Sequence, residues 1–140
     1  MKKERSVFNV VTTHILTTSV VIPFFGLLIG YMINKSLSTT LNQTEVLLIK
    51  DIVFIIFFFF GVRYSLSYID KTITVKDPKN SLRFSLIVFG LLMVMIFFLN
   101  VLAYPNTLNT IYNIAFFGII FILFYIPTKR YFTNLLSTLP

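Results

Sequence analysis

Four long apolar segments constrain this chain more than any other feature of its sequence. They cover roughly residues 8–31, 46–68, 85–102 and 111–127, and stretches such as IVFIIFFFF and LIVFGLLMVMIFFL contain no charged residue. A helix of about 17–25 such residues crosses the hydrocarbon core of a membrane and satisfies its own backbone hydrogen bonds there. The sequence therefore predicts an all-α, polytopic membrane protein, built as a bundle of four transmembrane helices.

The composition agrees with this interpretation. The chain has 140 residues, of which 56% are hydrophobic and 12% charged, whereas a soluble domain keeps about a quarter of its residues charged. The length allows one domain, so we treat residues 1–140 as a single membrane domain. The net charge is +7, but the basic residues stand at the ends of the apolar segments. We therefore expect the lipid bilayer, and not nucleic acid, as the partner of these charges.

The Lys and Arg residues predict the orientation. They precede the first segment, flank the connection between the second and third, and follow the fourth, whereas the other two connections together hold only Lys35 and Lys50. Cytoplasmic loops carry the excess of basic residues, so we expect a multi-pass protein of the cytoplasmic (inner) membrane with both termini in the cytoplasm. Residues 128–140 form a tail that is either a short amphipathic helix on the inner surface or disordered.

The first segment carries a polar stripe. Asn9, Thr13 and Thr17 recur every four residues and share one helix face, and His14 and Thr18 share a neighbouring face. Polar groups in a membrane helix face protein or water in preference to acyl chains. The stripe therefore either packs against other helices or lines a cavity.

Small residues follow in the same segment. Gly26 and Gly30 form the GxxxG pattern GLLIG, which lets another helix approach closely. That helix belongs either to this chain or to a partner protein. Pro23 removes one backbone hydrogen bond and is expected to kink the segment.

The roles of four polar residues stay open at this point. His14, the single histidine, either takes part in proton transfer or forms a hydrogen bond to a neighbouring helix. Arg63 either anchors an anionic group, such as a lipid phosphate, or extends to the membrane surface along its own stem. Lys50 and Asp51 lie either in the outer interface or about one helical turn inside the membrane.

Catalysis and cofactors are not expected. The sequence contains no HExxH, GxSxG or P-loop motif, and one histidine without any cysteine makes a poor metal site. Of the five carboxylates, only Asp51 stands near the membrane interior. We therefore predict a protein that is not an enzyme and needs neither metal nor other cofactor.

The inner ends of the second and fourth segments are alike, YSLSYIDKTITV against FILFYIPTKRYFT, and SLRF before the third segment echoes SVFN before the first. Two parallel two-helix units would produce this pattern. The layout resembles the GtrA-like family of small four-span membrane proteins, on residues 64–77, 81–84 and 124–132. That family is associated with moving polyprenyl-phosphate-linked sugars in bacteria. The resemblance implies a lipid phosphate near four basic residues, Arg63, Lys71, Lys129 and Arg130.

Two classes of function remain. The favoured one is translocation of a small or lipid-linked substrate across the cytoplasmic membrane, with the protein working as a homo-oligomer because four short helices enclose little volume. The alternative is a non-catalytic accessory, immunity or assembly protein that binds another membrane protein. The polar stripe favours the first if it lines a cavity, and the GLLIG face favours the second if its partner lies on another chain.

Overall fold

The computed structural model describes residues 2–37 and 40–139. These residues are almost entirely helical, which confirms the predicted all-α class. The elements are β1 (Lys3–Arg5), α1 (Val7–Leu16), the π-helical turn η1 (Thr17–Val21), α2 (Ile22–Leu37), α3 (Gln43–Thr72), β2 (Ile73–Val75), α4 (Pro78–Ala103) and α5 (Thr107–Thr138).

Three helical segments of the described residues are long and apolar enough to cross a membrane. They are Val7–Leu37, Pro78–Ala103 and Thr107–Thr138, and they contain the first, third and fourth of the predicted spans. The second predicted span lies in α3, which is not among them. This helix carries six charged residues near its ends and after its central glycine: Glu45, Lys50, Asp51, Arg63, Asp70 and Lys71.

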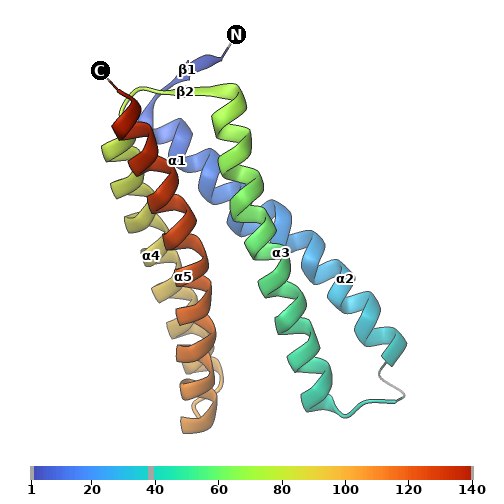
Figure 1. Ribbon diagram of the computed structural model, residues 1–140. Coiled ribbons are helices and arrows are strands. Elements are labelled where there is room, and N and C mark those ends of the chain that lie inside the picture. Colours follow the sequence, from blue (N-terminus) through green and yellow to red (C-terminus); the bar gives the residue numbers. More distant parts are fainter. Residues whose placement is uncertain (1, 38–39, 140) are drawn as a thin grey trace.

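The helices form two pairs that are joined at one end (Figure 1). Helix α2 packs against α3, and α4 packs against α5. Helix α1 contacts α4 and α3, and α3 also contacts α5. Both ends of the described chain lie at the same end of the bundle, beside β1 and β2.

The two strands join segments that are far apart in the sequence. Strand β1 pairs in parallel with β2, with Lys3 opposite Ile73 and Arg5 opposite Val75. Successive side chains of a strand point to opposite sides. Glu4 therefore points away from its two basic neighbours, and its carboxylate lies 2.8 Å from the ammonium nitrogen of Lys76. This ion pair raises the pKa of Lys76.

Side-chain caps fix where the helices begin. Asn42 and Glu45 form a capping box at the start of α3, in which each side chain accepts a hydrogen bond from the backbone of the other residue. Asp77 caps α4, and Pro78 occupies the first turn, where its missing N–H removes no helical bond. These caps set the boundaries of two helices by local chemistry.

The first helical segment widens at η1, directly before Pro23. The backbone N–H of Ile22 donates to the carbonyl of Thr17, five residues back. Proline lacks an N–H, and its ring crowds the carbonyl four residues earlier. A single π turn relieves that crowding while the chain stays helical.

Glycines bring α2 and α3 into close contact. Gly26 faces the side chain of Phe57, and Gly61 faces Ile22. Gly30 lies near Lys50, and both Gly26 and Gly30 are buried. The GLLIG face is therefore covered within the chain.

Phenylalanine rings from three helices form the centre of the bundle. Phe58 of α3, Phe89 of α4 and Phe124 of α5 are fully buried, and the rings of Phe89 and Phe124 stack with their centroids 3.9 Å apart. The residues that were expected to form a separate tail continue α5 to Thr138, and Phe132 in this part is also fully buried.

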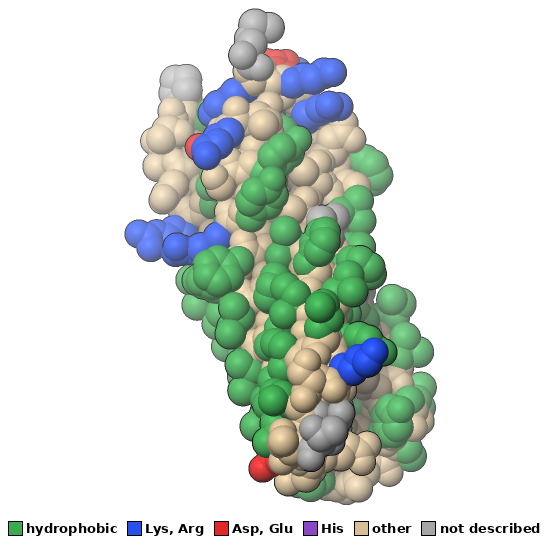
Figure 2. Space-filling view, turned by 90° about the vertical axis from the view of Figure 1, so that its right-hand side faces the viewer, with side chains coloured by type: hydrophobic (Ala, Val, Ile, Leu, Met, Phe, Trp, Pro, Cys, Tyr) green, Lys and Arg blue, Asp and Glu red, His purple; other side chains and the backbone are tan. Residues whose placement is uncertain are grey.

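The surface separates apolar from basic side chains (Figure 2). Hydrophobic side chains cover the middle of the face that is shown, and Lys and Arg side chains gather toward the end where the chain termini lie. Many of the largest apolar residues on the helices are exposed, including Leu91, Phe98 and Ile122. Such a surface suits contact with acyl chains.

Candidate functional site

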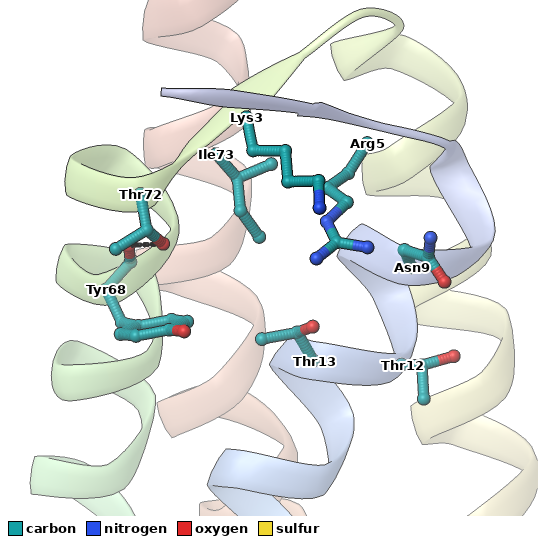
Figure 3. A pocket seen from close by; sticks show the side chains of 8 residues that line it. All are labelled: Lys3, Arg5, Asn9, Thr12, Thr13, Tyr68, Thr72 and Ile73. Atoms are coloured by element: carbon teal, nitrogen blue, oxygen red, sulfur yellow. Dashed lines mark hydrogen bonds between the residues drawn. The ribbon is translucent and has the colours of Figure 1, made fainter. Parts of the chain in front are cut away.

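A polar pocket lies at the end of the bundle that carries both termini (Figure 3). It has a volume of about 410 Å³, within the range of about 300–1,000 Å³ that is usual for small-molecule sites. Its lining comes from β1, α1, the end of α3 and the start of β2: Lys3, Arg5, Asn9, Thr12, Thr13, Tyr68, Thr72 and Ile73. We call it the β1 pocket.

Strand geometry places two cations over the β1 pocket. Lys3 and Arg5 are two residues apart in β1, so their side chains share one side of the strand, and both extend toward α1 (Figure 3). Within residues 2–37 and 40–139, neither cation has a carboxylate or another hydrogen-bond partner. Glu4, the nearest carboxylate in sequence, is occupied by Lys76 on the other side.

A second polar group lies inside the bundle, around His14. The imidazole is fully buried; its Nδ1 lies 2.8 Å from Oγ of Ser65 on α3, and its Nε2 lies 2.9 Å from Oγ1 of Thr128 on α5. The ring stacks on Phe124 with the centroids 4.9 Å apart, and the edge of Phe132 approaches it at 6.5 Å. We call His14, Ser65, Thr128 and Thr18 the His14 cluster.

The His14 cluster satisfies its hydrogen bonds locally. The hydroxyl of Thr18 donates to the carbonyl of His14 at 2.6 Å, and that of Ser65 donates to the same carbonyl at 3.4 Å. A neutral imidazole has one N–H donor and one acceptor nitrogen. With the proton on Nδ1, that N–H donates to Ser65 and the hydroxyl of Thr128 donates to Nε2, so every group has a partner. The cluster ties α1 to α3 and α5.

The predicted polar stripe divides between these two sites. Asn9 and Thr13 line the β1 pocket, whereas His14 and Thr18 face the interior. Thr17, the remaining member, lies half-buried at the start of η1. Adjacent residues of a helix point about 100° apart, which places Thr13 on the pocket side and His14 on the interior side.

The other basic candidates lie outside both sites. Arg63 is exposed on α3, with its guanidinium 5.3 Å from the ring centroid of Phe59. Lys129 is exposed on α5, with its ammonium 5.3 Å from the ring centroid of Tyr125. Lys71 and Arg130 are also exposed, and none of the four lines the β1 pocket.

Asp51 joins α3 to α5 at the far end of the bundle. Its carboxylate accepts a hydrogen bond from the hydroxyl of Tyr112. Lys50 is exposed on the neighbouring side of α3, next to Gly30. A matching contact stands at the end near the termini, where the hydroxyl of Tyr131 lies 3.5 Å from Oδ1 of Asp70.

Sequence reasoning missed the residues that complete both sites. It did not single out Lys3 and Arg5 as a pair, because MKKER shows no strand pattern and their shared side exists only in a strand. It also missed Ser65 and Thr128, which lie 51 and 114 residues from His14. Hydroxyl residues are common in membrane helices, so a single Ser or Thr gives no signal by itself.

No group of three or more His, Cys, Asp or Glu residues that could hold a metal ion occurs among the described residues. Comparisons of the chain with protein-family models, with curated proteins and with solved structures found no match. The assignment of a function therefore rests on the β1 pocket, the His14 cluster and the apolar helices.

Proposed function

We propose that this chain is a four-span protein of the cytoplasmic membrane that translocates a small or lipid-linked substrate, without catalysis. Both termini lie on the cytoplasmic side, as the distribution of Lys and Arg favours. The observation that carries the proposal is spatial: polar side chains line the β1 pocket, and further polar side chains form the His14 cluster in the interior of the bundle.

Two Tyr–Asp contacts support the proposal that α3 also crosses the membrane, which brings the number of spans to four. Asp51 and Asp70 bond tyrosines of α5 and lie 70 − 51 = 19 residues apart on α3, and Tyr112 and Tyr131 are likewise 131 − 112 = 19 residues apart. At 1.5 Å per residue this separation is about 28 Å, close to the hydrocarbon thickness of about 30 Å. Tyrosine is enriched at the two membrane interfaces. The contacts therefore fit the two boundaries of the bilayer.

Further polar side chains lie on α3 and α4. On α3, Thr72 and Tyr68 line the β1 pocket, and Ser65, about one turn further, bonds His14. On α4, the hydroxyls of Ser81 and Ser85 are buried and have no partner among the described residues. Buried polar groups in a protein usually have a partner, so these hydroxyls offer hydrogen bonds to a polar substrate that enters the bundle.

The placement of α3 has a direct test, because the chain contains no cysteine. Thr44 and Thr74 are exposed near the two ends of α3. We expect a membrane-impermeant maleimide to label Thr44→Cys in intact cells, and to label Thr74→Cys only after the cells are permeabilised, because the two positions lie on opposite sides of the membrane. Reaction from the same side would overturn the four-span topology.

Translocation is tested in vesicles. Purified protein is reconstituted with a trace of a fluorescent lipid phosphate, and dithionite, which does not cross the membrane, bleaches the outer leaflet. We expect the protein to make the inner-leaflet lipid available for bleaching. Ser65→Ala, which removes a hydrogen bond to His14, should slow this step, whereas Ser67→Ala at an exposed site two residues away should not. Bleaching equal to that of protein-free vesicles would refute the translocation of such a lipid.

We do not extend the proposal to an accessory protein that binds a partner through GLLIG. Gly26 and Gly30 face Phe57 and Lys50 of the same chain. A partner helix would have to displace α3 to reach them, and α3 also carries Ser65 of the His14 cluster.

A further inference from the structure

The β1 pocket combines two cations that have no carboxylate partner within residues 2–37 and 40–139 with neutral hydrogen-bond donors. Two residues along a strand span about 6.6 Å, so the side chains of Lys3 and Arg5 reach the same pocket from neighbouring points. Opposite them lie the amide of Asn9 and the hydroxyl groups of Thr12 and Thr13, half-buried on one side of α1. No carboxylate lines the pocket among the described residues.

We propose that the β1 pocket binds a phosphate group, with Lys3 and Arg5 as its cationic contacts and Asn9, Thr12 and Thr13 as its neutral donors. The role of this site in translocation rests on the proposed function. The site adds to that function a substrate class, because it assigns the substrate the chemistry of a phosphate ester. Its binding property stands on the pocket alone.

The charge and the number of donors favour phosphate over a carboxylate. A phosphate monoester carries about −1.5 to −2 charge at neutral pH and presents three acceptor oxygens, which matches two cations and several donors. Arginine binds such oxygens in pairs through its planar fork, and lysine adds a point charge. A carboxylate has one charge and two oxygens, so it would leave one cation and several donors unused.

The other side of the pocket suits the remainder of an ester. Tyr68 and Ile73 place a ring and an aliphatic side chain beside the polar groups (Figure 3). The hydroxyl of Thr72 is engaged, since it donates to the carbonyl of Tyr68 at 2.6 Å. Two sources supply the same phosphate chemistry, a soluble phosphate or the headgroup of a lipid. The experiment separates them.

The test compares two double variants at the same end of the bundle. Lys3→Gln with Arg5→Gln removes the two pocket cations, and Lys79→Gln with Arg83→Gln removes two exposed cations of α4 that do not line the pocket. Both variants lower the net charge equally. Neither changes a core residue, and circular dichroism verifies that each remains helical.

Two probes are used on the full-length protein. Calorimetric titration with inorganic phosphate in nanodiscs of phosphatidylcholine measures a soluble ligand, and native mass spectrometry after incubation with phosphatidic acid measures a retained lipid. We expect at least one probe to bind, with affinity lowered about tenfold or more in the Lys3/Arg5 variant and changed less than about twofold in the Lys79/Arg83 variant. The probe that binds identifies the source of the phosphate.

Three results would overturn the site: no binding of either probe, equal binding by the wild type and the Lys3/Arg5 variant, or an equal loss in the Lys79/Arg83 variant. The outcomes are distinct from those of the vesicle assay. Binding that depends on Lys3 and Arg5 without any bleaching of inner-leaflet lipid refutes translocation and keeps the site. Bleaching that the Lys3/Arg5 variant retains, together with unchanged binding, refutes the site and keeps translocation.

Discussion

Glycine-to-alanine substitutions on α2 and α4 distinguish two contributions to the free energy of unfolding, close packing between helices and the helix propensity of the substituted residue. An alanine methyl group at Gly26 would lie 2.8 Å from Cβ and 2.9 Å from Cγ of Phe57. These are the first atoms of the Phe57 side chain, so rotation of the ring does not move them far, and α2 must shift away from α3. At Gly30 the nearest atom would be Cγ of Lys50 at 3.7 Å, an ordinary contact, and at Gly90 no atom of the described residues lies within 4 Å.

These distances predict effects of opposite sign. Overpacking of a tight contact costs about 1–3 kcal/mol, and replacing glycine by alanine within a helix gains about 0.5–1 kcal/mol. Gly26→Ala should therefore lower the free energy of unfolding by about 1–2 kcal/mol. Gly30→Ala and Gly90→Ala should leave it unchanged or raise it by up to about 1 kcal/mol.

The free energy of unfolding is measured by titrating each variant with SDS in mild-detergent micelles and following helicity by circular dichroism. Gly90→Ala serves as the matched control, because it makes the same chemical change at an open position. If Gly26→Ala were as stable as Gly90→Ala, α2 and α3 would not approach each other at Gly26 as described.

Three further predictions concern polar contacts. Tyr112→Phe should lower the free energy of unfolding by about 1 kcal/mol. Adding Asp51→Asn to that variant should lower it little further, because the two side chains share one hydrogen bond. Additive losses in a double-mutant cycle would contradict this coupling. His14→Leu should lower the free energy of unfolding by about 1–3 kcal/mol, because two interhelical hydrogen bonds are lost, and a variant of wild-type stability in the same SDS titration would show that the cluster contributes nothing. The ion pair with Glu4 raises the pKa of Lys76. The stabilisation from this pair is therefore complete below the ordinary pKa of lysine and disappears as the pH rises through the raised value. Glu4→Gln should lower the pKa of Lys76 in a ¹³C NMR titration of the lysine side chain, and an unchanged titration would disprove the pairing.

The helices themselves were predictable from local sequence. Apolar runs located them, and short-range signals mark several ends: Asn42 with Glu45 before α3, and Asp77 with Pro78 before α4. Three of the four predicted spans correspond to helices that are long and apolar enough to cross a membrane. The C-terminal residues were predicted only as a separate tail, either a short amphipathic helix or disordered; they continue α5 to Thr138, with Phe132 buried by tertiary contacts after the apolar run has ended.

The two sites were only half predictable. Helical periodicity separates Asn9 and Thr13 from His14 and Thr18, and the structure places the pairs in the β1 pocket and the bundle interior. Periodicity does not determine how a neighbouring helix is rotated, so the partners of His14 on α3 and α5 remained unknown. The pairing of β1 with β2 connects three-residue segments about 70 positions apart, and so short a strand has too few alternations to be recognised.

The composition of α3 follows from its place in the bundle. Lipid tails are as apolar as leucine, so membrane helices gain little from hydrophobic burial against each other and associate through close packing and hydrogen bonds. Helix α3 contacts α1, α2 and α5, and its contact faces carry Gly61 against Ile22 and Ser65 against His14. Small and polar residues at such contacts suit a helix that packs against three others, and the six charged residues of α3 lower its mean hydropathy further. Hydropathy alone therefore does not decide whether α3 crosses a membrane, and labelling of single cysteines at positions 44 and 74 tests it directly.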